Sequence, residues 1–171
     1  MNASTTPRLD SMIIDFRGNI GGALDFVQVF LGAFIGDKQF AFDLFHQEEY
    51  QVQRTTINKF EPLSRYKDLV ILTDRMTQST AEVTAATFKR LRLATVIGET
   101  TRGWGTVENT FPIKTIIDEN ETYSLFLVHS LTLRDDNQPI EGKGVAPDID
   151  IHGTNVSSQL RTSLQNPSLF K

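Results

Sequence analysis

The chain has 171 residues, a formal net charge of −4 and 39% hydrophobic residues. That length and balance predict one soluble globular domain with a sizeable core. The lack of a basic stripe argues against nucleic acid or an anionic membrane as the main partner. Cysteine is absent, which excludes disulfides and thiolate metal sites. No apolar run reaches membrane-spanning length, and residues 1–9 do not form a signal peptide.

A glycine-rich turn follows the first apolar run. Residues 12–16 predict a buried strand, and the turn at residues 17–22 leads into an apolar-periodic segment, so we expect strand, loop and helix. Glycines let the backbone approach a ligand closely. The pattern matches neither the dinucleotide fingerprint nor a P-loop. A tight turn without function is the alternative.

The middle of the chain predicts parallel strands joined by crossover helices. The expected elements are a strand at 38–45, a surface partner strand at 47–57, a loop at 59–67, buried strands at 69–72 and 94–98, and a helix at 83–91 between those two strands. Short connections between strand, helix and strand indicate parallel pairing.

The pattern changes after residue 105. Residues 106–117 and 121–133 are β-rich and predict an antiparallel hairpin across a polar turn at 118–120. A loop at 141–149 precedes a short strand. Residues 154–171 are expected to be a polar tail that frays or forms one surface helix.

Ser79 lies where the buried strand at 69–72 is expected to turn into a helix. Backbone N–H groups are unpaired at a helix start, and the helix dipole favours negative charge there, so a serine nucleophile that creates an oxyanion gains from this position. The alternative is purely structural. Ser79 and Glu82 form the S-x-x-E pattern of a capping box, which satisfies the helix end.

Four separated motifs occur in order: DFRGNIGG at 15–22, STAE at 79–82, IGETT at 97–101 and GKGVAPDI at 142–149. Together they resemble the C-terminal processing peptidases, or tail-specific proteases, a family of serine peptidases. The resemblance implies an α/β fold of the Clp/crotonase type, with a mostly parallel central sheet, crossover helices and a C-terminal antiparallel hairpin. The PDZ module usually associated with this family is not visible in the chain.

The resemblance assigns roles by position. Ser79 takes the place of the family's nucleophile. The oxyanion hole would use the backbone N–H of Gly21 or Gly22 in the glycine-rich turn, together with that of Thr80. This agrees with the expectation that the turn and the helix start converge on one oxygen at the ends of neighbouring parallel strands.

One position departs from the family pattern. Trp104 stands where members with a Ser/Lys dyad carry the lysine, and Glu108 matches a glutamine that usually follows. An indole N–H only donates, so Trp104 cannot take a proton from Ser79. Arg102 is near, but its guanidinium stays protonated and makes a poor base. The Ser/Lys mechanism is therefore excluded.

Two interpretations stay open. The sequence at 98–103 resembles the tricorn-like and retinoid-binding-protein-like branch more closely. In that branch an earlier histidine is the base, and a later acid, here Glu141, supports the site. That histidine would precede residue 1, because His46, His129 and His152 are expected to be structural or exposed. Alternatively, the domain is catalytically degenerate and binds a peptide or ligand.

The sequence thus predicts a serine endopeptidase core at 1–153, followed by the tail at 154–171, as a C-terminal fragment of a longer protein. Trp104, Arg102 and Glu108 are candidate substrate-binding residues. The expected partners are a protein or peptide substrate and the missing N-terminal region of the same protein, while homo-oligomer formation is left open. No nucleic acid, metal or cofactor is implied. The resemblance implies a periplasmic or exported protein; the chain alone is also compatible with the cytoplasm.

Overall fold

A computed structural model describes residues 9–114, 121–153 and 155–165. Its elements are β1 (Leu9–Asp15), α1 (Asp25–Ile35), β2 (Phe40–His46), β3 (Glu49–Arg54), the short 3-10 helix η1 (Glu61–Arg65), β4 (Tyr66–Thr73), α2 (Thr80–Arg90), β5 (Thr95–Gly98), β6 (Thr106–Pro112), β7 (Ser124–Thr132), β8 (Ile149–Asp150) and α3 (Val156–Leu164). The expected hairpin turn at 118–120 lies outside the described residues.

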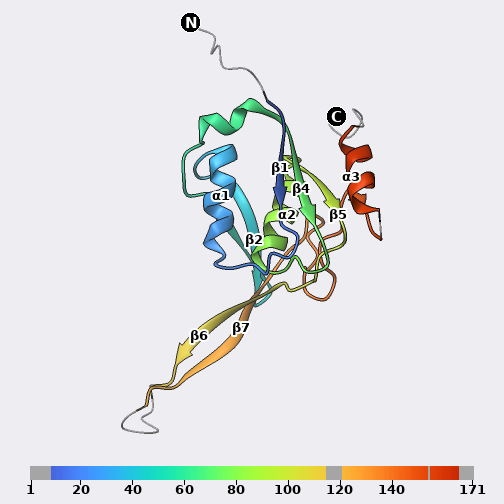
Figure 1. The fold of residues 1–171 in the computed structure, drawn as a ribbon. Helices are drawn as coiled ribbons and strands as arrows, with labels where there is room; N and C mark the ends of the chain where they lie inside the picture. Colours follow the sequence, from blue (N-terminus) through green and yellow to red (C-terminus); the bar gives the residue numbers. More distant parts are fainter. Residues whose placement is uncertain (1–8, 115–120, 154, 166–171) are drawn as a thin grey trace, which may run out of the picture.

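The first sheet is parallel throughout and has the strand order β1-β4-β5-β8 (Figure 1). Its strands are the apolar runs of the sequence, and α2 forms the crossover between β4 and β5. Side chains alternate between the two faces of a strand. Ile71 accordingly packs in the main core with α1 and α2, whereas Val70 and Leu72 pack with Ile97, Ile151 and Leu160 of α3 on the other face.

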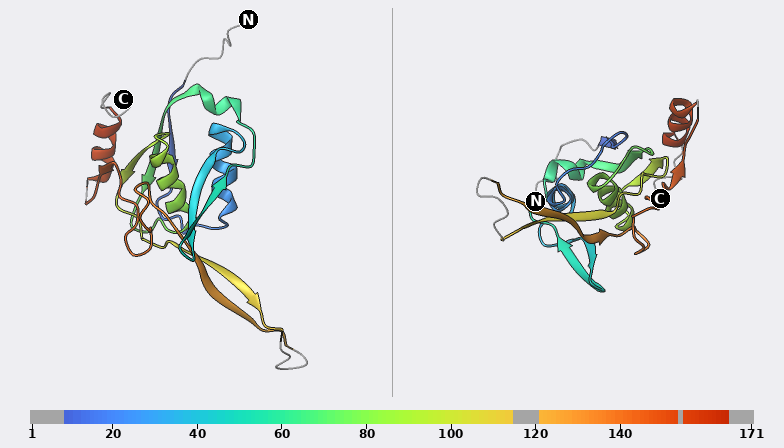
Figure 2. Two further views of the ribbon diagram at one scale, coloured as in Figure 1. Left: turned by 180° about the vertical axis from the view of Figure 1, so that it is seen from behind. Right: turned by 90° about the horizontal axis from the view of Figure 1, so that it is seen from below.

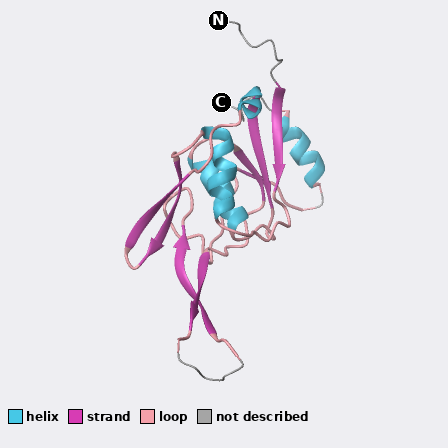
Figure 3. Ribbon diagram, turned by 90° about the vertical axis from the view of Figure 1, so that its left-hand side faces the viewer, coloured by secondary structure: helices cyan, strands magenta, loops and turns pink. Residues whose placement is uncertain are grey.

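The second sheet is antiparallel and has the order β3-β2-β7-β6. The predicted hairpin is confirmed as β6 and β7, which pair from Thr106 and Leu131 to Pro112 and Ser124. The predicted strand pair β2 and β3 joins the same sheet through contacts of β2 with β7, a long-range pairing that the sequence pattern does not reveal. The far half of the hairpin extends away from the body of the molecule (Figures 2 and 3).

Both the glycine-rich turn and the turn before α2 follow carboxyl ends of neighbouring strands. The turn after β1 is bound to the end of β4 by a hydrogen bond from the Phe16 N–H to the Leu72 carbonyl oxygen. It is bound to the next turn by one from the Gln78 N–H to the Asn19 carbonyl oxygen at 2.9 Å. The predicted α/β class with crossover helices is therefore confirmed, and the two turns of interest lie side by side.

No helix of the described ranges is both long and apolar enough to cross a membrane.

An aromatic cluster holds α1 and α2 together. Phe88 of α2 is fully buried, and its ring lies 5.7 Å from that of Phe30 and 5.2 Å from that of Phe34, both on α1. The contact packs α2 against α1 in the same core cluster that contains Ile71 of β4.

Truncation of this cluster should destabilise the protein strongly. We expect Phe88→Ala to lower the free energy of unfolding by about 3–5 kcal/mol, because a buried ring is lost and a cavity remains. The matched control is Phe126→Ala, since Phe126 on the hairpin is 70% exposed; it should change that free energy by less than about 0.5 kcal/mol. Urea denaturation of both variants measures the difference, and similar losses in the two would contradict the assignment of the core.

Candidate active site

Ser79 has an unusual backbone conformation at the junction of β4 and α2. Its φ of 56° and ψ of −128° are uncommon for a residue with a side chain. Such a strained turn between strand and helix is how a nucleophilic serine is presented in the α/β hydrolases. Ser79 also forms the predicted capping box with Glu82, whose Oε2 accepts a hydrogen bond from the Ser79 N–H at 2.8 Å. The predicted capping box is therefore confirmed, and it is compatible with the predicted nucleophile position of Ser79.

Gly21 is pressed against Ser79. A Cβ atom at Gly21 would lie 2.7 Å from the Ser79 Cβ and 2.9 Å from the Thr80 nitrogen, and the φ of Gly21 is +90°. Only glycine fits this approach. The Thr80 hydroxyl donates a hydrogen bond to the Gly22 carbonyl oxygen at 2.7 Å, which ties the glycine-rich turn to the first residue of α2.

The two glycines predicted for the oxyanion hole differ in whether their N–H groups are already hydrogen-bonded. The Gly21 N–H already donates to Asn19 Oδ1 at 2.8 Å. The N–H groups of Gly22 and Thr80 have no hydrogen-bond partner within the described part of the chain. Of the two alternatives, Gly22 is the one whose N–H remains available beside that of Thr80.

Glu82 connects the serine turn to the loop that carries Trp104. Its side chain is fully buried. Besides the Ser79 N–H, it accepts hydrogen bonds from the Thr101 hydroxyl, the Gly103 N–H at 2.7 Å and the Trp104 N–H at 2.8 Å. A buried carboxylate is tolerated only when its oxygens are well satisfied. The sequence indicated the cap but not this second set of bonds.

Two predicted site residues are engaged elsewhere. Glu141 Oε2 accepts a hydrogen bond from the Gly105 N–H at 2.8 Å, so this carboxylate holds the backbone that follows Trp104. Arg102 is exposed, and its backbone N–H donates to the Thr77 carbonyl oxygen at 2.9 Å. Neither residue lines the cleft beside Ser79.

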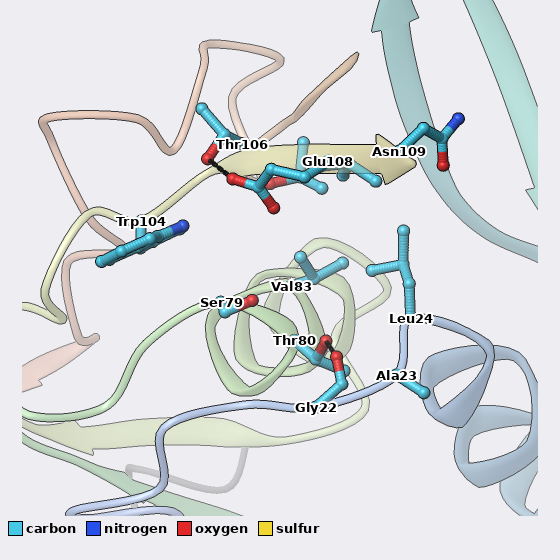
Figure 4. A pocket seen from close by; sticks show the side chains of 12 residues that line it. Gly22, Ala23, Leu24, Ser79, Thr80, Val83, Trp104, Thr106, Glu108 and Asn109 are labelled. Carbon is cyan, nitrogen blue, oxygen red and sulfur yellow. Dashed lines mark hydrogen bonds between the residues drawn. The ribbon is translucent and has the colours of Figure 1, made fainter. Parts of the chain in front are cut away.

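A cleft of about 340 Å³ opens beside Ser79 (Figure 4). Trp104 and Glu108, both predicted to contact substrate, line it. Glu108 projects from β6 toward the wall formed by Ser79 and Val83, and its Oε1 accepts a hydrogen bond from the Thr106 hydroxyl at 2.5 Å. The remaining lining residues, which sequence reasoning did not identify as such, are Ala23, Leu24, Val83, Thr106, Val107, Asn109 and Thr132. They come from the turn before α1, from α2 and from strands β6 and β7, and no local sequence pattern shows that these segments meet.

A second hollow of about 210 Å³ adjoins the same turn. It shares Gly22, Ala23 and Thr80 with the cleft, and Phe16 and Phe26 are among its other lining residues. The two N–H groups without a partner therefore belong to residues that border both spaces. A polypeptide bound across them would have room for a side chain in each.

The histidines do not line the cleft. The rings of His46 and His129 stack with centroids 3.9 Å apart, and His46 Nδ1 lies 2.5 Å from the His129 carbonyl oxygen. His152 is exposed beside Asp150. All three are structural or exposed, as expected. Among the described residues, no group of three or more histidine or acidic side chains is placed to hold a metal ion.

Asp74 joins the glycine-rich turn to the serine turn, a role that the sequence analysis missed. Its Oδ1 accepts hydrogen bonds from the N–H groups of Gly18, Met76 and Thr77 and from the Thr77 hydroxyl. Burial by itself would raise the pKa of Asp74, but these hydrogen bonds outweigh it and lower the pKa below 3.8. The sequence feature that could have pointed to this role is the position of Asp74 directly after β4.

Loss of the Glu82 carboxylate should destabilise the protein. In Glu82→Gln, the amide nitrogen faces donors that it cannot accept from, so we expect the free energy of unfolding to fall by about 2–4 kcal/mol. The matched control is Glu99→Gln, because Glu99 contacts Arg75 only at the surface, at 3.4 Å. That change should cost less than about 1 kcal/mol. Chemical denaturation measures both, and equal costs would contradict the role of Glu82.

Asp74 should make stability depend on pH in the acid range. Because its pKa is lower in the folded state, its contribution is complete above the ordinary value of 3.8 and is lost as the pH falls through the lowered value. Asp74→Asn keeps the accepting Oδ1 but removes the titrating charge. We expect the unfolding free energy of the variant to fall less steeply than that of the wild type between about pH 5 and pH 2. Equal slopes in denaturation curves across this range would refute the assignment.

Comparison with known proteins places this geometry in a family. The family model described as peptidase family S41 matches residues 2–151. A tail-specific protease of Haemophilus influenzae is 28% identical over 147 residues, covering 84% of this chain and 20% of the relative. A carboxy-terminal-processing protease of Bartonella bacilliformis is 28% identical over 144 residues, covering 84% of this chain and 31% of the relative. The chain thus spans about a fifth to a third of these curated relatives.

Solved structures show the same fold. The photosystem II D1 C-terminal processing protease aligns with a TM-score of 0.65 at 18% identity, covering 84% of this chain and 35% of its own. A lipoprotein from Streptococcus agalactiae aligns with a TM-score of 0.64 at 22% identity, covering 91% and 54%. With the family match over most of the chain, these findings confirm the resemblance found in the sequence: the chain belongs to peptidase family S41.

Proposed function

We propose that the chain is a serine peptidase domain in which Ser79 Oγ attacks the carbonyl carbon of a protein or peptide. The observation that carries this proposal is the strained backbone of Ser79, which opens onto the cleft at the start of α2 with Gly21 packed against it. A strained conformation persists only when its surroundings hold it in place. Here Glu82 and Gly21 do so.

In the proposed reaction, the Oγ–carbon bond forms as the carbonyl π electrons move to oxygen. The resulting oxyanion accepts hydrogen bonds from the N–H groups of Gly22 and Thr80, at the positive end of the α2 dipole. Collapse of the tetrahedral intermediate then breaks the carbon–nitrogen bond, and the amine leaves with the proton that the base took from Ser79. The acyl-enzyme that remains is hydrolysed by water, which releases the acid and returns the proton to Ser79. This makes the turn a stabiliser of the transition state.

The proton of Ser79 needs an acceptor, and the proposal places that base outside these 171 residues. Trp104 cannot accept a proton. Glu108 lies across the cleft from Ser79 with one oxygen engaged by Thr106 (Figure 4). A histidine from an N-terminal region would supply this base, as it does in the branch that the sequence at 98–103 resembles. Two further points stay predictions: that Glu141 supports the catalytic site, and that the chain belongs to the tricorn-like and retinoid-binding-protein-like branch.

A second candidate function is binding without hydrolysis. It is favoured by Trp104, whose side chain is 45% exposed at the cleft where a proton acceptor is expected. An exposed aromatic ring suits contact with a peptide. The names of the relatives further suggest C-terminal regions of proteins as substrates, and the family resemblance suggests a periplasmic or exported location. These too are part of the proposal.

A fluorophosphonate probe separates the two functions. On the folded protein with its N-terminal region present, we expect labelling that Ser79→Ala abolishes, because only an activated serine reacts. The control Ser64→Ala alters an exposed serine of η1 and should leave labelling unchanged. Mass spectrometry of the labelled peptide identifies the site. Absence of labelling in that protein would favour the binding module.

The isolated 171 residues should react with the same probe at least about 100-fold more slowly than the protein that has its N-terminal region, since general base catalysis is missing. Rapid labelling of the isolated chain at Ser79 would show that a base lies within it and would overturn the proposed origin of the proton acceptor.

A further inference from the structure

We propose that Glu108 and Trp104 form a subsite for a basic side chain, lysine or arginine, of the bound peptide. The inference rests on the proposed function in that it assigns a substrate class to the same cleft. It applies equally to a peptidase and to a peptide-binding module, because it concerns binding and not the chemical step.

Glu108 provides an uncompensated negative charge in the cleft. Of the described residues that line this space, it is the only charged one. The described ion pairs do not include it. The Thr106 hydroxyl occupies Oε1 and so orients the carboxylate, while Oε2 has no described partner and remains free to accept a bond from a ligand. The side chain is directed toward the opposite wall of the cleft (Figure 4).

Trp104 provides the second element of the subsite. Its ring lies in the same cleft and is partly open to solvent. The backbone N–H groups of Gly103 and Trp104 are bound by the buried Glu82, so the segment that carries the indole is fixed before a ligand arrives. A cation near the face of a tryptophan ring gains about 0.5–2 kcal/mol, depending on how far it is desolvated.

The walls suit the rest of a basic side chain. Leu24 and Val83 line the cleft beside Glu108. Lysine and arginine bury their methylene stems on apolar surface while the charged head reaches a polar partner. An acidic side chain would instead meet the Glu108 charge in a cleft where water screens it incompletely. The cleft should therefore discriminate by charge as well as by size.

The single tryptophan makes binding directly measurable. Trp104 is the only tryptophan of the chain, so its fluorescence reports on this cleft alone. The Ser79→Ala protein is titrated with three acetylated, amidated alanine pentapeptides that carry lysine, norleucine or glutamate at the centre. We expect the lysine peptide to shift Trp104 emission with a Kd about fivefold lower than the norleucine peptide, and the glutamate peptide to bind most weakly.

Changes at Glu108 test the assignment. Glu108→Gln should weaken the lysine peptide about fivefold and leave the norleucine peptide unchanged. Glu108→Lys should reverse the preference, so that the glutamate peptide binds more tightly than the lysine peptide. The matched control Glu61→Gln removes an exposed carboxylate of η1 and should change neither affinity. Far-UV circular dichroism and thermal unfolding verify that each variant is folded.

Equal affinities for the three peptides in the folded Ser79→Ala protein, or an unchanged order in Glu108→Lys, would overturn the subsite. Failure of the peptidase proposal is a separate outcome, because these titrations use a protein without the nucleophile. Charge preference without fluorophosphonate labelling would retain the subsite in a binding module. Labelling without charge preference would retain the peptidase and reject the subsite.

Discussion

The buried carboxylate of Glu82 is the constraint on which the candidate site depends. Its two oxygens accept four hydrogen bonds, from the serine turn on one side and from residues 101–104 on the other. Removing a carboxylate from water is costly, and only this set of donors offsets it. The same four bonds therefore fix the serine backbone and the loop opposite it in a single arrangement. The width of the cleft between Ser79 and Trp104 follows from them.

Close backbone approaches complete that arrangement. The Thr101 hydroxyl that donates to Glu82 accepts a hydrogen bond from the Val145 N–H at 2.7 Å. Gly144 lies so near Thr101 that a Cβ atom would collide with its carbonyl oxygen. The GKGVAPDI motif thus packs against Thr101 and supports the loop that Glu82 holds. Gly21 acts in the same way on the other side of Ser79.

The fold could be read largely from local pattern, because apolar runs with short connections predict parallel strands. The S-x-x-E spacing likewise indicated the bond between Ser79 and Glu82, which lie one helical turn apart. The bonds from Glu82 to Gly103 and Trp104 could not be predicted, since they depend on how two distant loops meet. The same holds for Glu141, which the family resemblance predicted as an acid that supports the site and whose carboxylate accepts a hydrogen bond from the Gly105 N–H. Its partner is a backbone group, which leaves no trace in the sequence.

The departure at Trp104 has a physical basis in the same bonds. Glu82 holds this loop through the N–H groups of residues 103 and 104, and a backbone N–H is present whatever the side chain. The side chain at position 104 can therefore change from a proton acceptor to an aromatic ring without moving Ser79, the proposed nucleophile, or the N–H groups of Gly22 and Thr80. The framework that positions Ser79 is independent of the group that would activate it. In the proposed reaction, a tryptophan in place of the lysine of Ser/Lys members removes one acceptor for the Ser79 proton but leaves the geometry that a base from another part of the protein would need. It also adds an exposed ring to the wall of the cleft.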